Sequence, residues 1–428
     1  MNEFQVLIVP SPALMAGRIA LAFALVGIQY CVFRAGRGIA NLLDIKNRVR
    51  KAIESGFLVF ICVINLPLAL FFLESLVSPR TELFYSPPPR YEWIIRPASY
   101  FFFVWSVGSI LFVAGAPVCM AVFGAWRLWR VRRVGQDPER ESAAVDLSKR
   151  RFIGLALAGV GTVPFAAAAY GAVVARSHKV VERMDVFLRG LPPGLDGLTV
   201  VQMSDIHTGM FMSETEIEEC VKIANGLRPG LIVLTGDFVA TRRSQVIPFM
   251  SAMSQLKARY GVYGCLGNHD MFTDSESSIQ SAFKQAGFAL LRNENKVIEI
   301  NGSRLNIIGV DFIPSNAKRR NPLAHALNGI SLEGTTLLLA HNPNAFPEAA
   351  KAGIDLTLSG HTHGGQIGLS VGGMLITPVA LATMFVAGHF KIGDSHLYVN
   401  RGIGTTGPPI RINAPPEITC LTLHPAAP

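Results

Sequence analysis

Residues 198–207 read L-T-V-V-Q-M-S-D-I-H, a short apolar run that ends in two polar side chains, Asp205 and His207. The pattern recurs at 231–238, L-I-V-L-T-G-D-F, where an apolar run ends in Asp237. Apolar runs of about four to eight residues are typical of strands that are buried on both faces of an α/β sheet. Such sheets place their functional sites at the carboxyl ends of the strands. We therefore expect an α/β domain with a site at these strand ends.

Three further predicted strands end in polar residues. Asn268, His269 and Asp270 follow the run at 262–266, His341 follows 335–340, and His361 and His363 follow 354–358. Helices are predicted between the strands, near 213–227, 245–258, 275–286 and 345–352; the first opens with the capping-box sequence S-E-T-E. The dipeptide N-G at 301–302 predicts a hairpin between two apolar runs.

The part of the chain before this domain has a different composition. The 428 residues carry a formal net charge of +9 and a mean hydropathy of +0.36. Residues 1–176 contain 19 Lys and Arg against 10 Asp and Glu, whereas residues 177–428 contain 20 of each and all ten histidines. The excess positive charge therefore belongs to residues 1–176, and we expect no nucleic-acid partner for the domain at 177–428.

Four apolar stretches dominate residues 1–176, at 13–33, 56–77, 99–126 and 152–175. A helix of about 20 apolar residues crosses a hydrocarbon layer of about 30 Å, so we expect a membrane anchor of about four transmembrane helices. Core helices of a soluble domain are the alternative, and the length and number of the stretches speak against it. Lys and Arg concentrate in 34–55 and 127–151, which predicts that these connections are cytoplasmic. The domain at 177–428 then lies outside, on the periplasmic side of a bacterial inner membrane.

The fourth stretch has a second interpretation. Residues 148–153, S-K-R-R-F-I, resemble a twin-arginine export signal with Lys in place of the first Arg. The apolar run that follows suits either an export signal or a retained span with an ordinary basic flank. Both interpretations place the following domain outside.

The polar residues at the strand ends share one kind of chemistry. Carboxylate, carboxamide and imidazole groups without thiolates suit Mn²⁺, iron or Zn²⁺. The potential ligands are Asp205, His207, Asp237, Asn268, His341, His361 and His363. This set is too large for one four-coordinate ion and suits two ions that share a carboxylate. In D-x-H and H-x-H, alternate residues of an extended segment face the same side, which brings both to one site.

Five blocks in this order resemble the calcineurin-like metallophosphoesterases: S-D-I-H (204–207), G-D-F (236–238), G-N-H-D (267–270), H-N-P (341–343) and G-H-T-H (360–363). The segments G-G-Q (364–366) and R-G-I-G (401–404) are similar to the membrane-anchored bacterial branch, the YkuE/YaeI type. The resemblance covers about 198–423 and implies a sandwich of two β-sheets flanked by helices, in four αββα layers.

The resemblance also implies roles for the site residues. One metal ion would be held by Asp205, His207, Asp237 and His363, and the other by Asp237, Asn268, His341 and His361, with Asp237 bridging. His269 would lie beside the phosphorus and protonate the leaving oxygen, and Asp270 would orient the loop or His269. The implied reaction is hydrolysis of a phosphodiester or phosphomonoester by hydroxide that bridges two divalent ions.

Three features outside this set have two interpretations each. Arg242 and Arg243 could contact a substrate phosphate or start a solvated helix. The basic residues at 318–320 could steer an anionic lipid headgroup or lie in an ordinary exposed loop. The apolar residues at 210–212 could contact an acyl chain or the bilayer, or pack in the core.

We therefore expect a membrane-anchored, metal-dependent phosphoesterase. Its substrate could be lipid-linked, because tethering raises the effective concentration of a membrane-borne ester. Two alternatives stay open. A pyrophosphohydrolase of the UDP-2,3-diacylglucosamine type is disfavoured by the predicted orientation, because that substrate is cytoplasmic. A metal-binding membrane sensor without turnover is the other.

Overall fold

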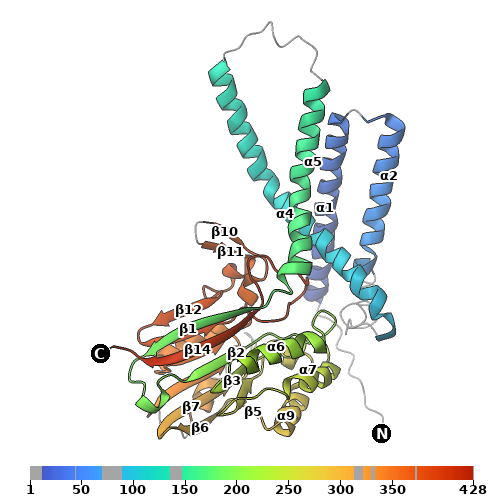
Figure 1. Ribbon diagram of the computed structural model, residues 1–428. Helices are drawn as coiled ribbons and strands as arrows, with labels where there is room; N and C mark the ends of the chain where they lie inside the picture. Colours follow the sequence, from blue (N-terminus) through green and yellow to red (C-terminus); the bar gives the residue numbers. More distant parts are fainter. Residues whose placement is uncertain are drawn as a thin grey trace. The chain divides into compact units, whose positions relative to one another are not determined.

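The computed structural model describes residues 12–43, 45–69, 89–134, 147–312, 322–328, 333–371 and 374–427 (Figure 1). These residues form two compact units, one that ends at Ala172 and one that begins at Val173. Residues 70–77 of the second predicted span and the basic cluster at 318–320 lie outside the described residues.

Four long helices make up the first unit: α1 (Pro12–Leu42), α2 (Asn47–Ile64), α4 (Pro89–Val134) and α5 (Leu147–Tyr170). Within this unit α5 packs against α4 and α1, and α2 packs against α1 and α4. Four segments are long and apolar enough to cross a membrane: Ile19–Leu42, Asn47–Ala69, Tyr91–Ala121 and Phe152–Ala175. In the most apolar window of each segment at most 33% of the residues are buried. Most of the apolar side chains therefore face outward, as in membrane spans.

Two six-stranded sheets form the second unit (Figure 1). The first sheet has the order β1 (Val180–Leu188), β14 (Glu417–Pro425), β2 (Thr199–Met203), β3 (Leu231–Thr235), β4 (Val262–Cys265), β5 (Ala289–Leu290). The second has the order β12 (Gly388–Ile392), β13 (Ser395–Val399), β9 (Leu356–Ser359), β8 (Thr335–Ala340), β7 (Ser303–Val310), β6 (Glu294–Ile300). β2 to β5 are parallel to one another, and so are β7, β8, β9 and β13.

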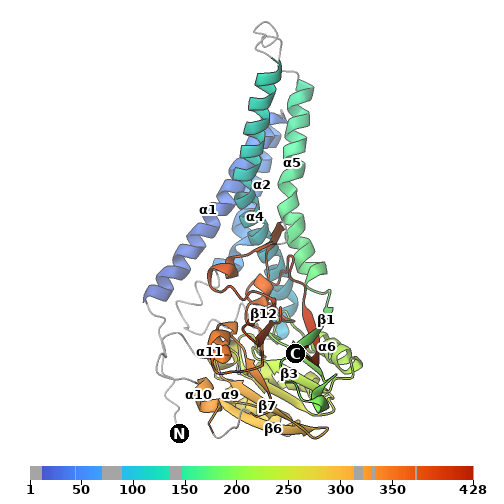
Figure 2. The same cartoon turned by 90° about the vertical axis from the view of Figure 1, so that its left-hand side faces the viewer.

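Alternation along the buried strands produces four layers. In β2, Val201 and Met203 pack toward helices α6 (Glu214–Gly226), α7 (Val246–Met253) and α9 (Glu276–Gln285), whereas Val200 packs toward the second sheet. The outer face of the second sheet packs on α10 (Pro322–Ala326) and α11 (Phe346–Lys351). Figure 2 shows α10 and α11 on one side of the sheets and α6 on the other. The αββα sandwich is confirmed, and burial on both faces explains why the strands are continuous apolar runs.

Two local predictions are confirmed. Ser213 caps α6 and forms the complete capping box with Glu216. Asn301 and Gly302 join β6 to β7 with φ values of +49° and +75°, the conformation that an N-G hairpin turn requires.

Several elements are additions to the predicted set. β1 alternates poorly because it lies at the sheet edge and carries Glu182, Arg183 and Asp185, so its sequence does not predict a strand. The short helix α8 (Asn268–Phe272) follows β4, and β10 (Leu369–Val371) follows β9. β10 pairs in a hairpin with β11 (Met374–Ile376), which begins where the sequence predicts short C-terminal strands.

Candidate metal centre

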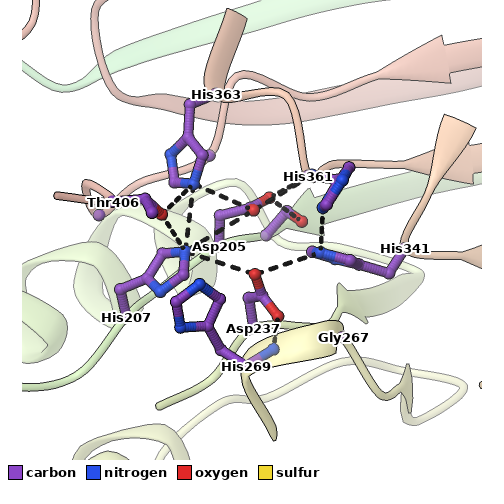
Figure 3. Close-up of polar contacts among 12 residues, drawn as sticks. Asp205, His207, Asp237, Gly267, His269, His341, His361, His363 and Thr406 are labelled. Carbon is purple, nitrogen blue, oxygen red and sulfur yellow. Dashed lines mark hydrogen bonds and ion pairs between the residues drawn. The ribbon is translucent and has the colours of Figure 1, made fainter. Parts of the chain in front are cut away.

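Polar side chains from both sheets converge where β2, β3 and β4 of the first sheet and β8 and β9 of the second end (Figure 3). Among the described residues, three groups have ligand atoms that all lie within 4.8 Å of one another: Asp205, His207 and His363; His207, Asp237 and His269; and Asp237, His341 and His361. The predicted clustering at one edge of the sandwich is therefore what the structure contains.

The first group surrounds the Nε2 atom of His207. This atom lies 3.1 Å from Nε2 of His363, 3.5 Å from Asp237 Oδ2 and 3.9 Å from Asp205 Oδ1. His363 Nε2 in turn lies 3.4 Å from Asp205 Oδ1. Two ring nitrogens and two carboxylate oxygens thus face one another across a small space, which is an arrangement that a cation can stabilise.

The group of Asp237, His341 and His361 surrounds the Nε2 atom of His341 and forms the second candidate ion position. This Nε2 atom lies 3.2 Å from Asp237 Oδ2 and 3.1 Å from Nδ1 of His361. The opposite ring nitrogen of His341, Nδ1, lies 2.7 Å from the carbonyl oxygen of Thr235. Because a carbonyl can only accept, Nδ1 carries a proton, and Nε2 is the ring atom that faces Asp237. Burial alone would lower the pKa of His341, but the carboxylates of Asp237 and Asp205 raise it to about 10, so the ring without an ion is charged and a bound cation would take the place of the Nε2 proton.

Two further properties show that the residues fit a divalent metal. Burial lowers the pKa of His207 to about 3 and that of His361 to about 4, and it holds the pKa of His363 well below its usual value, so these rings are neutral. The amide oxygen of Asn268 is buried and has no hydrogen-bond partner among the described residues. A buried amide oxygen without a partner is costly, and an ion would satisfy it.

Asp237 is the residue that links the two groups. Burial alone would raise its pKa, but the charged imidazole of His341, which also donates a hydrogen bond to this carboxylate, outweighs burial and holds the pKa well below its usual value. Its Oδ1 accepts the backbone N–H of His269 at 2.8 Å, which leaves Oδ2 toward both histidine groups. A single carboxylate therefore belongs to both candidate ion positions.

The backbone that carries these ligands is strained. Five ligand residues have φ between +49° and +72°, a backbone region that residues other than glycine rarely adopt: Asp205, His207, Asp237, His361 and His363. Each such residue costs about 1–3 kcal/mol and persists only when its surroundings enforce it. Strain of this kind gathers at functional sites.

The motif glycines make room for the ligands themselves. A Cβ on Gly267 would lie 2.1 Å from Asp237 Oδ1, and one on Gly360 would lie 2.2 Å from Asp205 Oδ2. The carboxylates of Asp237 and Asp205 therefore occupy the space that these glycines leave.

The Asp270 carboxylate holds two ligand loops together. It accepts backbone N–H groups of Asp237 and Gly267 on one oxygen, at 2.9 Å each, and those of Phe238 and Val239 on the other, at 2.8 and 3.3 Å. Its neighbour His269 places Nδ1 2.7 Å from the carbonyl oxygen of Ala240. That carbonyl fixes the proton on Nδ1, so Nε2 is the ring atom that can exchange a proton at the site.

The residues with two sequence interpretations lie as follows. Arg243 donates to Ser278 on α9, and Arg242 directly precedes the short 3₁₀ turn Arg243–Gln245. Met210 and Met212 are buried, which favours the core interpretation.

Sequence reasoning missed the roles of two residues in the loop after β13, Thr406 and Arg411, and of Gln366, which follows β9 and holds that loop. Thr406 places its hydroxyl 3.0 Å from His207 Nε2 and 2.9 Å from His363 Nε2. The side chain of Gln366 clamps this loop, accepting the N–H of Thr406 at 2.9 Å and donating to the carbonyls of Thr406 and Pro408. The fully buried Arg411 donates to the carbonyls of Arg401, Gly402, Gly404 and Ala414.

One signal pointed to this loop. Arg411 is the only charged residue in 402–416, G-I-G-T-T-G-P-P-I-R-I-N-A-P-P, so the sequence marks this residue as distinct within its loop, and the structure shows that it is buried.

Comparison with known proteins agrees with this site. The family model described as calcineurin-like phosphoesterase matches residues 198–365. The chain is 33% identical over 240 residues to the uncharacterized metallophosphoesterase YkuE of Bacillus subtilis, a match that covers 54% of this chain and 81% of that protein. It is 30% identical over 227 residues to the phosphodiesterase YaeI of Escherichia coli, covering 52% of this chain and 81% of the other.

A further relative extends the similarity toward the helices. The bovine transmembrane protein with metallophosphoesterase domain is 32% identical over 298 residues, 66% of each chain. This share is larger than residues 177–428 can supply, so the similarity reaches into the helical unit. From the five motif blocks, the matching family model and the 81% coverage of a relative at 33% identity, this chain belongs to the calcineurin-like metallophosphoesterases, which are metal-dependent phosphoric ester hydrolases.

Proposed function

We propose that this chain is a membrane-anchored phosphoesterase that hydrolyses a phosphodiester or phosphomonoester with the help of two divalent cations. The observation that carries the proposal is the position of Asp237, whose Oδ2 lies 3.5 Å from His207 Nε2 and 3.2 Å from His341 Nε2, one ring from each candidate ion position. One ion would be held by Asp205, His207, Asp237 and His363, and the other by Asp237, Asn268, His341 and His361. Mn²⁺, iron and Zn²⁺ suit these donors.

The cations would supply Lewis-acid stabilisation of the phosphoryl oxygens and a hydroxide nucleophile at neutral pH. The chain itself supplies the proton for the leaving group. His269 holds Nδ1 against Ala240 and keeps Nε2 free, so its protonated form would donate from Nε2 to the leaving oxygen. The ring lies edge-on to His207 at 4.7 Å between centroids, which places this donor beside the first ligand group.

Thr406 would contribute a hydrogen bond to the same reaction. Its hydroxyl is held beside His207 and His363 by the Gln366 clamp and is on the exposed side of the loop. When the imidazole nitrogens are engaged by an ion, the hydroxyl is free to donate to a phosphoryl oxygen.

Four candidate membrane spans and relatives named as transmembrane proteins support a membrane anchor. The orientation rests on sequence: basic residues concentrate in 34–55 and 127–151, which would be cytoplasmic. We place the catalytic domain on the opposite side, the periplasmic face of a bacterial inner membrane.

The activity is tested on the purified full-length protein in detergent, with a chromogenic phosphodiester and a chromogenic phosphomonoester. We expect turnover with Mn²⁺ and none with excess EDTA. Asp237→Asn should lower kcat at least about a hundredfold, since even outer-shell changes at metal sites reach that size. His269→Gln should lower it about 10²–10⁴-fold, the range of general acid catalysis. His178→Gln, an exposed histidine outside the site, is the matched control.

A folded protein that hydrolyses neither substrate with any divalent metal would refute the enzymatic proposal and favour a metal-binding sensor. A reporter fused to the C-terminus tests the orientation. Activity of a reporter that works only in the cytoplasm would refute it and would revive a cytoplasmic nucleotide-lipid substrate.

A further inference from the structure

The first strand of the catalytic unit starts at the edge that carries the metal centre. β1 is parallel to β14, and β14 is antiparallel to β2. Val180 pairs with Glu417, and Thr419, two residues further along β14, pairs with Gln202. The beginning of β1 therefore lies level with the residues that directly follow β2, which are Ser204 and Asp205.

The chain reaches this edge from the last candidate span by a short link. That span ends at Ala175 and β1 begins at Val180. At about 3.5 Å per residue the link reaches at most about 18 Å. Within the catalytic unit Arg176 is fixed beside the site loop, because it donates to the carbonyl of Phe211 and pairs with Glu216 at 2.9 Å. The site edge is thus the edge tethered to the anchor.

A surface at this edge is apolar and uncharged. Residues 364–388 contain no Asp, Glu, Lys, Arg or His. Leu369 is 61% exposed, Ile376 57%, Leu381 94% and Met384 78%. We call these four residues the apolar rim. Leu369 and Ile376 pair across the β10–β11 hairpin, and Leu381 ends the turn Pro378–Leu381 that follows it.

The apolar rim is attached to the loops that carry the histidines. Thr377 donates at 3.2 Å to the carbonyl of Gly365, which lies two residues after His363. Thr362, between His361 and His363, donates to the carbonyl of Val386 at 2.6 Å, and Thr383 donates to Asn344 at 2.8 Å. Both ends of the apolar segment are therefore fixed next to the metal centre.

This concentration of apolar residues is unusual for the rest of the unit. Val173 and Val174 are exposed at the end of the last candidate span; the unit's other exposed large apolar side chains among the described residues stand singly on different elements: Phe187, Ile247, Phe272, Val297 and Ile392. Scattered apolar residues are normal on a protein surface, whereas a contiguous group indicates a binding surface. An uncharged apolar group on the edge tethered to membrane spans fits the interfacial region of a bilayer.

Resting on the proposed phosphoesterase function, we infer that the apolar rim is a bilayer-contact surface and that the phosphate ester hydrolysed at the metal centre is carried by a lipid. A lipid headgroup lies at the water boundary of the bilayer, so a site beside an inserted rim meets the phosphate without extracting the lipid. A buried-core role for this segment would not leave Leu381 almost fully exposed.

The contact is tested on the full-length protein reconstituted in phosphatidylcholine vesicles. The exposed native cysteines Cys31, Cys62 and Cys119 are replaced by alanine, while the buried Cys220, Cys265 and Cys420 stay. A fluorophore is then attached at Leu381→Cys or, as the matched control, at Ile247→Cys on α7, which is 77% exposed. We expect lipid-borne nitroxide to quench position 381 at least threefold more than position 247. Equal quenching at both positions would overturn the bilayer contact.

The substrate is tested with phosphatidic acid and phosphatidylglycerol in the same vesicles, beside the soluble chromogenic esters. The double change Leu381→Asp and Met384→Asp should lower hydrolysis of the lipid at least tenfold and leave the soluble ester within twofold; Ile247→Asp should change neither. The lipid assignment would be overturned if the protein hydrolysed the soluble ester but neither lipid. It would also be overturned if the double variant hydrolysed the lipid as fast as the parent protein. Absence of any hydrolysis would instead refute the proposed function, and the quenching result would still decide the bilayer contact.

Discussion

The buried Asp270 carboxylate provides the sharpest test of how the ligand loops are held. Each of its oxygens accepts two backbone N–H groups, from Asp237 and Gly267 on one side and from Phe238 and Val239 on the other. Replacement by asparagine keeps the shape but turns one oxygen into an NH₂ group. That group can only donate, so two buried N–H groups lose their acceptor and face another donor.

Two effects oppose each other in Asp270→Asn. Hydrogen bonds to a charged group contribute about 1.5–3 kcal/mol each, so the loss of two costs about 3–6 kcal/mol. Burial and the nearby Asp237 carboxylate raise the pKa of Asp270, which means that its negative charge is unfavourable at this position. Removing the charge therefore offsets part of the lost hydrogen-bond energy. Bound cations would neutralise the charge of Asp237, so removing the Asp270 charge would stabilise the metal-loaded protein less. We expect a net loss of at least about 2 kcal/mol in the metal-loaded protein.

Hydrogen exchange read by mass spectrometry measures this loss at the loops themselves. The amides of 237–239 and 267 should exchange at least about 30-fold faster in Asp270→Asn, since 1.36 kcal/mol corresponds to a factor of ten. Asp355→Asn is the matched control: Asp355 uses a single oxygen to accept both the N–H and the hydroxyl of Thr336, and an asparagine can keep it. Exchange in Asp270→Asn as slow as in the parent protein would refute the reasoning.

Three further results are expected. Thr406→Val should lower kcat/KM about 10–100-fold, the size of one hydrogen bond to a charged group, while Thr406→Ser restores it and calorimetric metal affinity stays unchanged; equal activity of both variants would contradict a hydroxyl role. Asn268→Ala should weaken one of two metal-binding steps more than about tenfold in a metal titration, and a single unaltered isotherm would contradict its ligand role. Burial, together with Lys391 and His389, lowers the pKa of His396 to about 4. Between pH 6.5 and 4 the unfolded histidine, with pKa about 6.5, is protonated while the folded one stays neutral. The free energy of unfolding should therefore fall as pH drops through this range, and His396→Gln should make that fall smaller in thermal unfolding.

Much of the catalytic unit is predictable because its signals are local. The runs at 231–235 and 335–340 are buried on both faces and match β3 and β8 in extent. The Ser213 capping box forms within one turn of helix and needs no distant partner. The motif residues were assigned as one site because strand ends of an α/β sheet converge, and the structure brings Asp237, His341 and His361 together.

The missed features depend on partners far away in the chain. β1 becomes a strand by pairing with β14 at the other end of the chain, so its own sequence is a weak guide. Thr406 reaches His207 only because the Gln366 clamp and the buried Arg411 fold its loop over the site. The apolar rim looks like core in sequence, and only its exposure in the fold separates the two.

The ligands come from both sheets, so the metal centre can be complete only when both sheets are present. His207 and His363 are 156 residues apart in sequence, and Thr406 follows later still. Bringing two such distant residues together costs loop-closure entropy before their contact can stabilise the chain. We therefore expect the ligand set to be completed late in folding, after both sheets have formed and packed together. A nascent chain therefore has no complete site with which to capture an ion. The ion that fills the centre is therefore drawn from the compartment in which the sandwich closes.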